Sequence, residues 1–264
     1  MSKTILFIVE GERRDYRFVN NMTDIFLNGK YKTEIINVPA EQNLYMLYQI
    51  LKEDNFDTDL IEVIRDTVPG AKEKLEGIVR QEVDEIYLFF DYDIHQDNYH
   101  SDEDVISVLL DAFDNETENG KLYISYPMVE ALYDYKDGEC ESFTGCCIKA
   151  EDVKDYKELS GKNNPKSGLH LKYKDWETIL ELFTIKVMCL YKVEEISFNM
   201  YKEQVFPLSI YYLEKEIHEE EKQVFVLSAF PEFLFDYFKI DFWNSHSAKK
   251  NRKYNKCEHR ACAD

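Results

Sequence analysis

The chain has 264 residues, of which 44% are hydrophobic and 14% aromatic. This composition excludes an intrinsically disordered protein and is sufficient for a substantial core in one or two domains. The 52 acidic and 32 basic residues give a formal net charge of −20 at pH 7. A field of this sign repels phosphate, so it excludes bulk, nonspecific adhesion to nucleic acid and leaves only local contacts by basic patches.

The amino-terminal sequence and the cysteines indicate the compartment. The first apolar run, residues 4–9, is too short to span a membrane, and no secretory signal pattern accompanies it. The six cysteines are irregularly spaced, and we expect reduced thiols. We therefore expect a cytoplasmic protein with no membrane partner.

The first predicted element is a strand at residues 4–9, a continuous apolar run typical of a strand buried on both faces of a parallel sheet. It ends at Glu10-Gly11, where glycine permits a tight turn or the close approach of a ligand. Apolar residues then recur at helical spacing, at positions 18, 19, 22, 25 and 26. Glu10 is thus expected at the carboxyl end of a strand, the edge at which open α/β sheets bind ligands.

Strands and helices continue to alternate as far as residue 135. In chain order, the pattern predicts a strand at 33–38, a helical face at 44–51, polar helical segments within 55–82, a strand at 85–90, a helix at 105–113, a strand at 121–126 and a helix start at Pro127. This alternation predicts an α/β fold with a parallel sheet flanked by helices.

The strand at residues 85–90 ends in Asp91-Tyr92-Asp93. Side chains at i and i+2 of an extended segment point to the same side, so Asp91 and Asp93 are suited to share one cation. Two carboxylates this close repel each other unless a metal ion or a proton lies between them. The alternative is a solvated turn after a core strand, because aspartate favours the start of loops.

Acidic residues follow three of the predicted strands: Glu10, then Asp91 and Asp93, then Glu130. If these strands are adjacent and parallel, the carboxylates converge on one edge, with Asp15 one turn into the first helix. Hard oxygen ligands without a histidine pattern suit Mg²⁺ or Mn²⁺ rather than zinc. A site of this kind binds phosphate oxygens and activates water.

Val9-Glu10-Gly11 and Asp91-Tyr92-Asp93, each at the end of a predicted strand, resemble the TOPRIM domain of topoisomerases, primases and OLD-type nucleases. The resemblance covers roughly residues 3–135 and implies a TOPRIM-like parallel sheet. It also implies that Glu10 acts in acid/base chemistry or metal binding and that Asp91 and Asp93 bind a divalent metal.

The chain size and the segment Tyr126-Pro127-Met128-Val129-Glu130 resemble the small stand-alone TOPRIM nucleases of prokaryotic phage-defence systems. That resemblance implies an antiviral enzyme that works beside an ATPase partner. Many members carry an acid three or four residues after the first glutamate, where this chain has Arg13 and Arg14.

Arg13 and Arg14 are candidates for binding a phosphate through bidentate contacts. The alternative is that they are ordinary solvated charges of a first helical turn.

After residue 135 the sequence becomes aromatic and mainly helical in spacing, over residues 173–190 and 205–242, with no strand predicted. Loop-like sequence near residues 140–165 indicates a boundary. We therefore predict a TOPRIM-like catalytic domain at residues 1–140, a mainly helical domain at residues 141–245 and a basic, mobile tail at residues 246–264. The tail holds six basic and two acidic residues, and the spacing of its Cys and His residues matches no common zinc module.

The resulting hypothesis is a nuclease that depends on Mg²⁺ or Mn²⁺, cuts DNA or RNA, and acts in anti-phage defence. Glu10, Asp91 and Asp93 are its expected catalytic and metal-binding residues, and Asp15 and Glu130 are further ligands or residues that orient them. The strong negative charge suggests that an ATPase partner or an inhibitor protein masks or redirects the enzyme.

The alternative hypothesis is a catalytically silent TOPRIM-like regulatory or binding subunit of a multi-protein complex. The aromatic second half of the chain is compatible with a homo-oligomer as well as with a monomeric core, and the sequence leaves both open.

Overall fold

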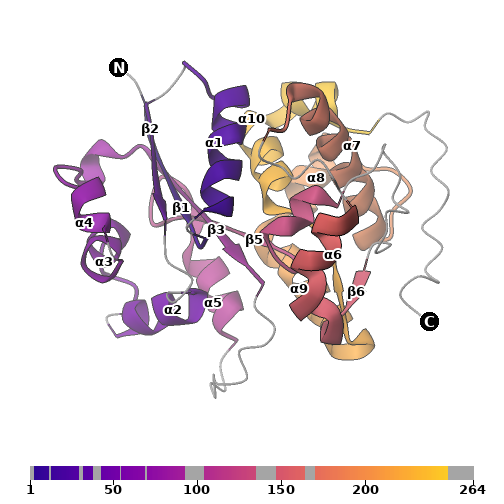
Figure 1. Cartoon of the computed structure of the whole chain (residues 1–264), viewed down its shortest axis with the longest axis horizontal. Coiled ribbons are helices and arrows are strands. Elements are labelled where there is room, and N and C mark those ends of the chain that lie inside the picture. The colour runs from indigo at the N-terminus through magenta and orange to yellow at the C-terminus, as the bar shows by residue number, and fades with distance from the viewer. Residues whose placement is uncertain are drawn as a thin grey trace. The chain divides into compact units, whose positions relative to one another are not determined.

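The structure is a computed structural model of the chain (Figure 1). It describes residues 3–11, 13–29, 32–37, 43–53, 55–68, 70–92, 104–134, 147–163 and 170–248, with the backbone alone at 35–37 and 161–163. The chain divides into two compact units. The first comprises Met1–Phe90 and His95–Tyr123, and the second comprises Asp91–Ile94 and Ile124–Asp264.

The amino-terminal half alternates strands and helices. Its elements are β1 (Thr4–Val9), α1 (Arg14–Phe26), β2 (Lys32–Asn37), α2 (Leu44–Lys52), α3 (Leu60–Thr67), α4 (Ala71–Lys74), η1 (Arg80–Glu82), β3 (Glu85–Asp91), α5 (Val105–Ala112), β4 (Asp114–Asn115) and β5 (Gly120–Ser125).

The strands form a five-stranded sheet in the order β2-β1-β3-β5-β4. β1 pairs in parallel with β2 on one side and with β3 on the other, and the two-residue β4 pairs antiparallel with β5. The prediction of an α/β fold with a mostly parallel sheet flanked by helices, followed by a mainly helical region, is therefore confirmed.

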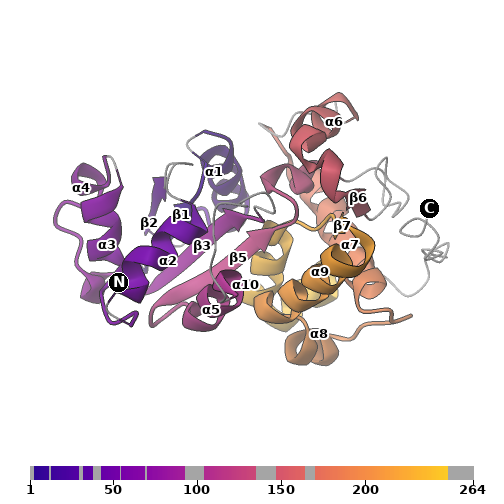
Figure 2. The same cartoon turned by 90° about the horizontal axis from the view of Figure 1, so that it is seen from below.

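β1 is central because both its faces and both its edges are covered. Its residues Ile5–Val9 are each at most 1% exposed, as expected for an unbroken apolar run in a parallel sheet. α1 covers one face of the sheet, and α2 packs against α5 on the other face (Figure 2). This division follows from right-handed crossovers that run in opposite directions along the sheet, the first from β1 to β2 and the next from β2 back past β1 to β3.

The carboxyl-terminal half is mainly helical. Its elements are η2 (Val129–Tyr133), β6 (Cys147–Lys149), η3 (Ala150–Asp155), α6 (Tyr156–Asn163), α7 (Tyr173–Leu190), α8 (Phe198–Gln204), α9 (Pro207–Glu221), β7 (Gln223–Phe225) and α10 (Ala229–His246).

Two expectations for this half differ from the structure. β6 and β7 form an antiparallel pair where no strand was predicted, because their pairing joins segments far apart in the sequence. The helix start expected at Pro127 is the short 3₁₀ helix η2, which closes with a hydrogen bond of 3.1 Å from the Asp134 N–H to the Ala131 carbonyl.

The second unit has an aromatic core. Trp176 of α7 is fully buried, and the ring of Trp243 lies 4.6 Å from that of Tyr201 and 5.0 Å from that of Phe235. Aromatic pairs at this separation add to the stabilisation gained from area burial. None of the helices in the described part of the chain combines the length and the apolar character needed to cross a membrane.

The backbone of α10 breaks at Lys239, whose φ of 62° and ψ of −149° lie in a region that essentially only glycine adopts. We expect Lys239→Gly to be more stable than Lys239→Ala by about 1 kcal/mol, because only glycine removes the strain at Cβ. Both variants lose the ion pair between Lys239 and Asp236, so their comparison isolates the backbone. Urea denaturation measures the difference in the free energy of unfolding between the two variants. Equal values would show that the backbone at residue 239 is not strained.

Candidate functional site

The carboxyl ends of β1 and β3 lie at the same edge of the sheet. Val9 pairs with Phe89, and the Glu10 N–H extends this pairing by donating to the Phe89 carbonyl oxygen at 3.2 Å. From β1 the chain passes to β2 on one side, and it returns to β3 on the other, so the topological switch point lies between β1 and β3. In open α/β sheets, ligands bind outside the carboxyl ends of the strands at this point.

The turn from β1 to α1 is shaped by a buried aspartate. Asp15 is 5% exposed in the first turn of α1, where the helix dipole favours a negative charge. A methyl group placed on Gly11 would lie 2.0 Å from Asp15 Oδ2, so this turn requires glycine for close approach. Arg13 is exposed just before α1, and Arg14, its first residue, is half-buried.

In the second unit, Asp91 is attached to η2. Its Oδ1 accepts a hydrogen bond of 2.8 Å from the N–H of Val129, the first residue of that helix. The next residue, Glu130, is only 3% exposed, and Lys157 Nζ lies 4.0 Å from its Oε1. Asp91 therefore caps the short helix that carries Glu130, a structural role that exists without any metal.

The predicted site residues that the structure describes thus fall into two sets, one in each unit. Glu10 and Asp15, with Arg13 and Arg14, belong to the turn after β1, and Asp91 and Glu130 belong to the second unit. Asp93 lies outside the described residues, as do residues 249–264 of the predicted tail. Among the residues that are described, no group of three or more His, Cys, Asp or Glu could hold a metal ion. The metal site and the predicted domain limits remain predictions.

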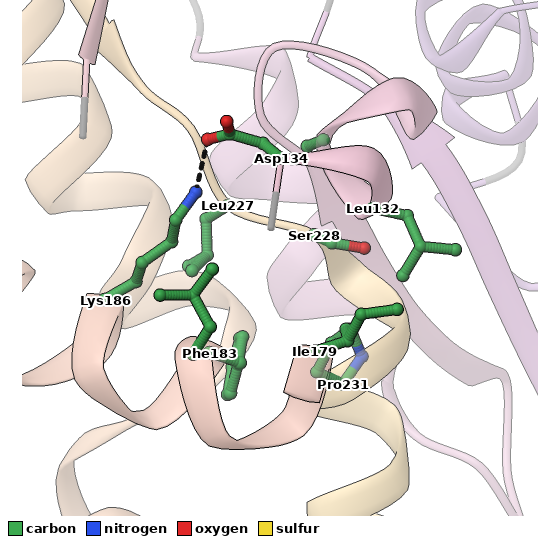
Figure 3. Close-up of a pocket in the computed structure, with 10 residues that line it drawn as sticks. Leu132, Asp134, Ile179, Phe183, Lys186, Leu227, Ser228 and Pro231 are labelled. Carbon is green, nitrogen blue, oxygen red and sulfur yellow. Dashed lines mark hydrogen bonds and ion pairs between the residues drawn. The ribbon is translucent and has the colours of Figure 1, made fainter. Parts of the chain in front are cut away.

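The sequence analysis did not single out a buried ion pair in the second unit. Lys186 Nζ lies 2.6 Å from Asp134 Oδ2 (Figure 3). It also donates to the carbonyl oxygen of Val226 at 2.9 Å. The side chains of Lys186 and Asp134 are 5% and 0% exposed. One signal was present in the sequence: Lys186 stands at a core position of α7, in helical register with buried Ile179 and Phe183.

A small cavity lies beside this ion pair. It has a volume of about 20 Å³, and besides Asp134 and Lys186 its lining includes Leu132, Ile179 and Ser228 (Figure 3). A volume of this size holds about one water molecule. The cavity is therefore too small to be a substrate site.

Buried tyrosines form a second feature that the sequence analysis missed. Tyr126 is 2% exposed, its ring lies 5.1 Å from that of Tyr92, and its Oη has no hydrogen-bond partner in the described part of the chain. Burial raises the pKa of the Tyr126 phenol well above its ordinary value, and the negative charges of Glu214 and Glu232 raise it further. Burial likewise raises the pKa of Tyr156 and Tyr201.

The chain was compared with known protein families, with curated proteins and with solved structures, and none of the three comparisons gave a match.

We expect Gly11→Ala to lower the free energy of unfolding by about 2 kcal/mol, because its methyl group must displace the buried Asp15 carboxylate. In an Asp15→Ala background the overlapping oxygen is gone, so the same substitution should cost under about 0.5 kcal/mol. A double-mutant cycle measured by urea denaturation gives this coupling. Equal costs in both backgrounds would show that the contact does not constrain residue 11.

The raised tyrosine pKa values predict alkaline instability. The contribution of these phenols to stability is fully present below about pH 10, the pKa of tyrosine in the unfolded chain. It is lost as pH rises above that value, because the phenols of the unfolded chain release their protons before those of the folded chain do. Between pH 10 and 11, the free energy of unfolding of the wild type should fall more steeply than that of Tyr126→Phe, by up to about 1.4 kcal/mol per pH unit. Tyr212→Phe is the control, since Tyr212 is 52% exposed. If the free energy of unfolding of Tyr126→Phe falls with pH as steeply as that of the wild type, the pKa of Tyr126 is not raised.

Proposed function

We propose that this chain is a nuclease that hydrolyses phosphodiester bonds of DNA or RNA and depends on Mg²⁺ or Mn²⁺. One observation carries the proposal: the topological switch point of the sheet lies between β1 and β3, and these are the strands followed by Glu10 and ended by Asp91. Ligands of open α/β sheets bind at this position. The resemblance of the same two segments to TOPRIM domains also supports the proposal.

The chemistry of the donor set fits a hard divalent cation. Glu10, Asp91 and Asp93 would hold the ion, with Asp15 and Glu130 as further ligands or residues that orient them. A bound Mg²⁺ or Mn²⁺ supplies charge stabilisation to the phosphoryl oxygens and lowers the pKa of water.

The residues of the chain have separate tasks in this proposal. The Glu10 carboxylate takes the proton of the attacking water, and Arg13 and Arg14 bind the substrate phosphate. The hydrogen bond from the Val129 N–H fixes the rotation of the Asp91 carboxylate, which keeps its second oxygen in one direction.

The net charge of −20 makes free association with nucleic acid unfavourable. We therefore propose that an ATPase partner or an inhibitor protein directs the enzyme, as an effector of anti-phage defence. An isolated chain that cuts at its full rate and forms no complex with such a partner would contradict this part of the proposal.

The test is cleavage of labelled plasmid, single-stranded DNA and transfer RNA, each in Mg²⁺ and in Mn²⁺. We expect metal-dependent cleavage that falls at least about 100-fold in Glu10→Gln and in Asp91→Asn, since general acid/base groups contribute roughly 10²–10⁴-fold. Asparagine is chosen because its side-chain oxygen still accepts a hydrogen bond from the Val129 N–H, so the cap of η2 is preserved while the charge is lost.

Glu73→Gln, at an exposed acid, is the charge-matched control and should retain wild-type activity. Cleavage that persists in Glu10→Gln and Asp91→Asn would belong to a contaminant and would overturn the proposal. A wild type that neither cuts nor gains thermal stability from Mn²⁺ would instead favour the silent binding subunit, because a ligand of the folded state raises its stability.

A further inference from the structure

The serine at the start of α10 does not cap its helix. Ser228 is the N-cap residue, and its φ of −91° and ψ of 137° are the extended values typical of that position. A serine there ordinarily accepts a hydrogen bond from the N–H of the second or third helical residue. The Ser228 hydroxyl forms no such bond.

The sequence supplies part of the reason. The third residue of α10 is Pro231, which has no N–H to donate. The N–H of the first residue, Ala229, donates instead to Ser125 Oγ at 3.3 Å. Ser228 is nevertheless only 7% exposed, and its Oγ has no hydrogen-bond partner within the described part of the chain. A buried hydroxyl in this state is rare, because it has lost its hydrogen bonds to solvent and gained none in return.

Ser228 lines the cavity of about 20 Å³ in the second unit (Figure 3). The same lining contains the buried ion pair of Asp134 and Lys186. An internal water molecule needs about 10–15 Å³ of such space and two or more polar partners. The cavity has this volume, and its lining offers a hydroxyl, a carboxylate and an ammonium group.

The ion pair gives a second reason to expect water. Burying two charges is repaid only when additional hydrogen bonds satisfy their donors and acceptors. The carbonyl oxygen of Val226 accepts one such bond from Lys186 at 2.9 Å. A water molecule in the cavity would add another, because it can both donate and accept. Most of the other lining residues are apolar, and a wholly apolar cavity would stay dry, so the polar groups decide which state holds.

We propose that this cavity binds one internal water molecule, held by the Ser228 hydroxyl and by the ion pair of Asp134 and Lys186. The water replaces the absent helix cap as the partner of Ser228, and it links the start of α10 to the ion pair. This inference goes beyond the proposed nuclease function and is independent of it, because it requires neither a metal ion nor nucleic acid.

The test counts long-lived internal water molecules in the full chain by magnetic relaxation dispersion of water oxygen-17. Ser228→Val removes the hydroxyl and adds apolar volume at the same position, so we expect one long-lived water molecule fewer than in the wild type. Ser160→Ala is the matched control. Ser160 is 1% exposed and its hydroxyl also has no partner among the described residues, but it does not line the cavity. Its water count should equal that of the wild type.

Ser228→Ala gives a second readout that does not require valine to fit. If the hydroxyl binds water, its removal should lower the equilibrium constant for folding about two- to tenfold, as for other lost hydrogen bonds. If the cavity is dry, the same substitution removes a buried hydroxyl that has no partner, and the constant should rise. Urea denaturation measures the change.

The two readouts together decide the proposal. One water molecule fewer in Ser228→Val, with a lower folding constant in Ser228→Ala, supports the water site. An unchanged water count, or a higher folding constant in Ser228→Ala, overturns it. Neither result depends on the cleavage assay, so the water site and the nuclease proposal fail or stand separately.

Discussion

β1 is hydrogen-bonded on both edges and buried on both faces, and its register determines where the residues that follow it lie. Because Val9 is paired with Phe89, the turn after β1 begins at the carboxyl edge of β3. A shift of one residue in this register would send every side chain of β1 to the opposite face, so the buried core fixes the register strongly. The position of the Glu10 backbone is therefore a consequence of core packing several residues earlier.

The second unit relies on a different kind of constraint. Its candidate acid Glu130 is carried by a five-residue 3₁₀ helix, whose residues are all buried but whose own hydrogen bonds are few. Polar attachments add to this burial: a capping carboxylate from Asp91 at the start and a charged pair between Asp134 and Lys186 at the end. Such attachments are directional, whereas hydrophobic contacts are not. A short helix anchored in this way is suited to aim a side chain, and its geometry is sensitive to residues far from it in the sequence.

The sequence predicted those features that arise from local patterns. α7 was expected at residues 173–190 and spans Tyr173–Leu190, because its apolar positions recur at helical spacing over its full length. β7 was missed because it has three residues and its pairing partner β6 lies more than seventy positions earlier. The ion pair joins residues 52 positions apart, and no periodicity reports such a contact. The Gly11–Asp15 contact, in contrast, spans a single helical turn, so the local sequence contained the information to predict it.

The proposed phosphodiester substrate carries the same sign of charge as the residues that would bind it. Carboxylates such as Glu10 and Asp91 repel a phosphodiester, and the net charge of −20 adds to that repulsion. In the proposed nuclease, a divalent cation would resolve this conflict, because it would reverse the sign of the local field where the phosphate binds. If nucleic acid is the substrate, the acidity of the chain makes the metal a requirement for binding the substrate as well as for the chemical step.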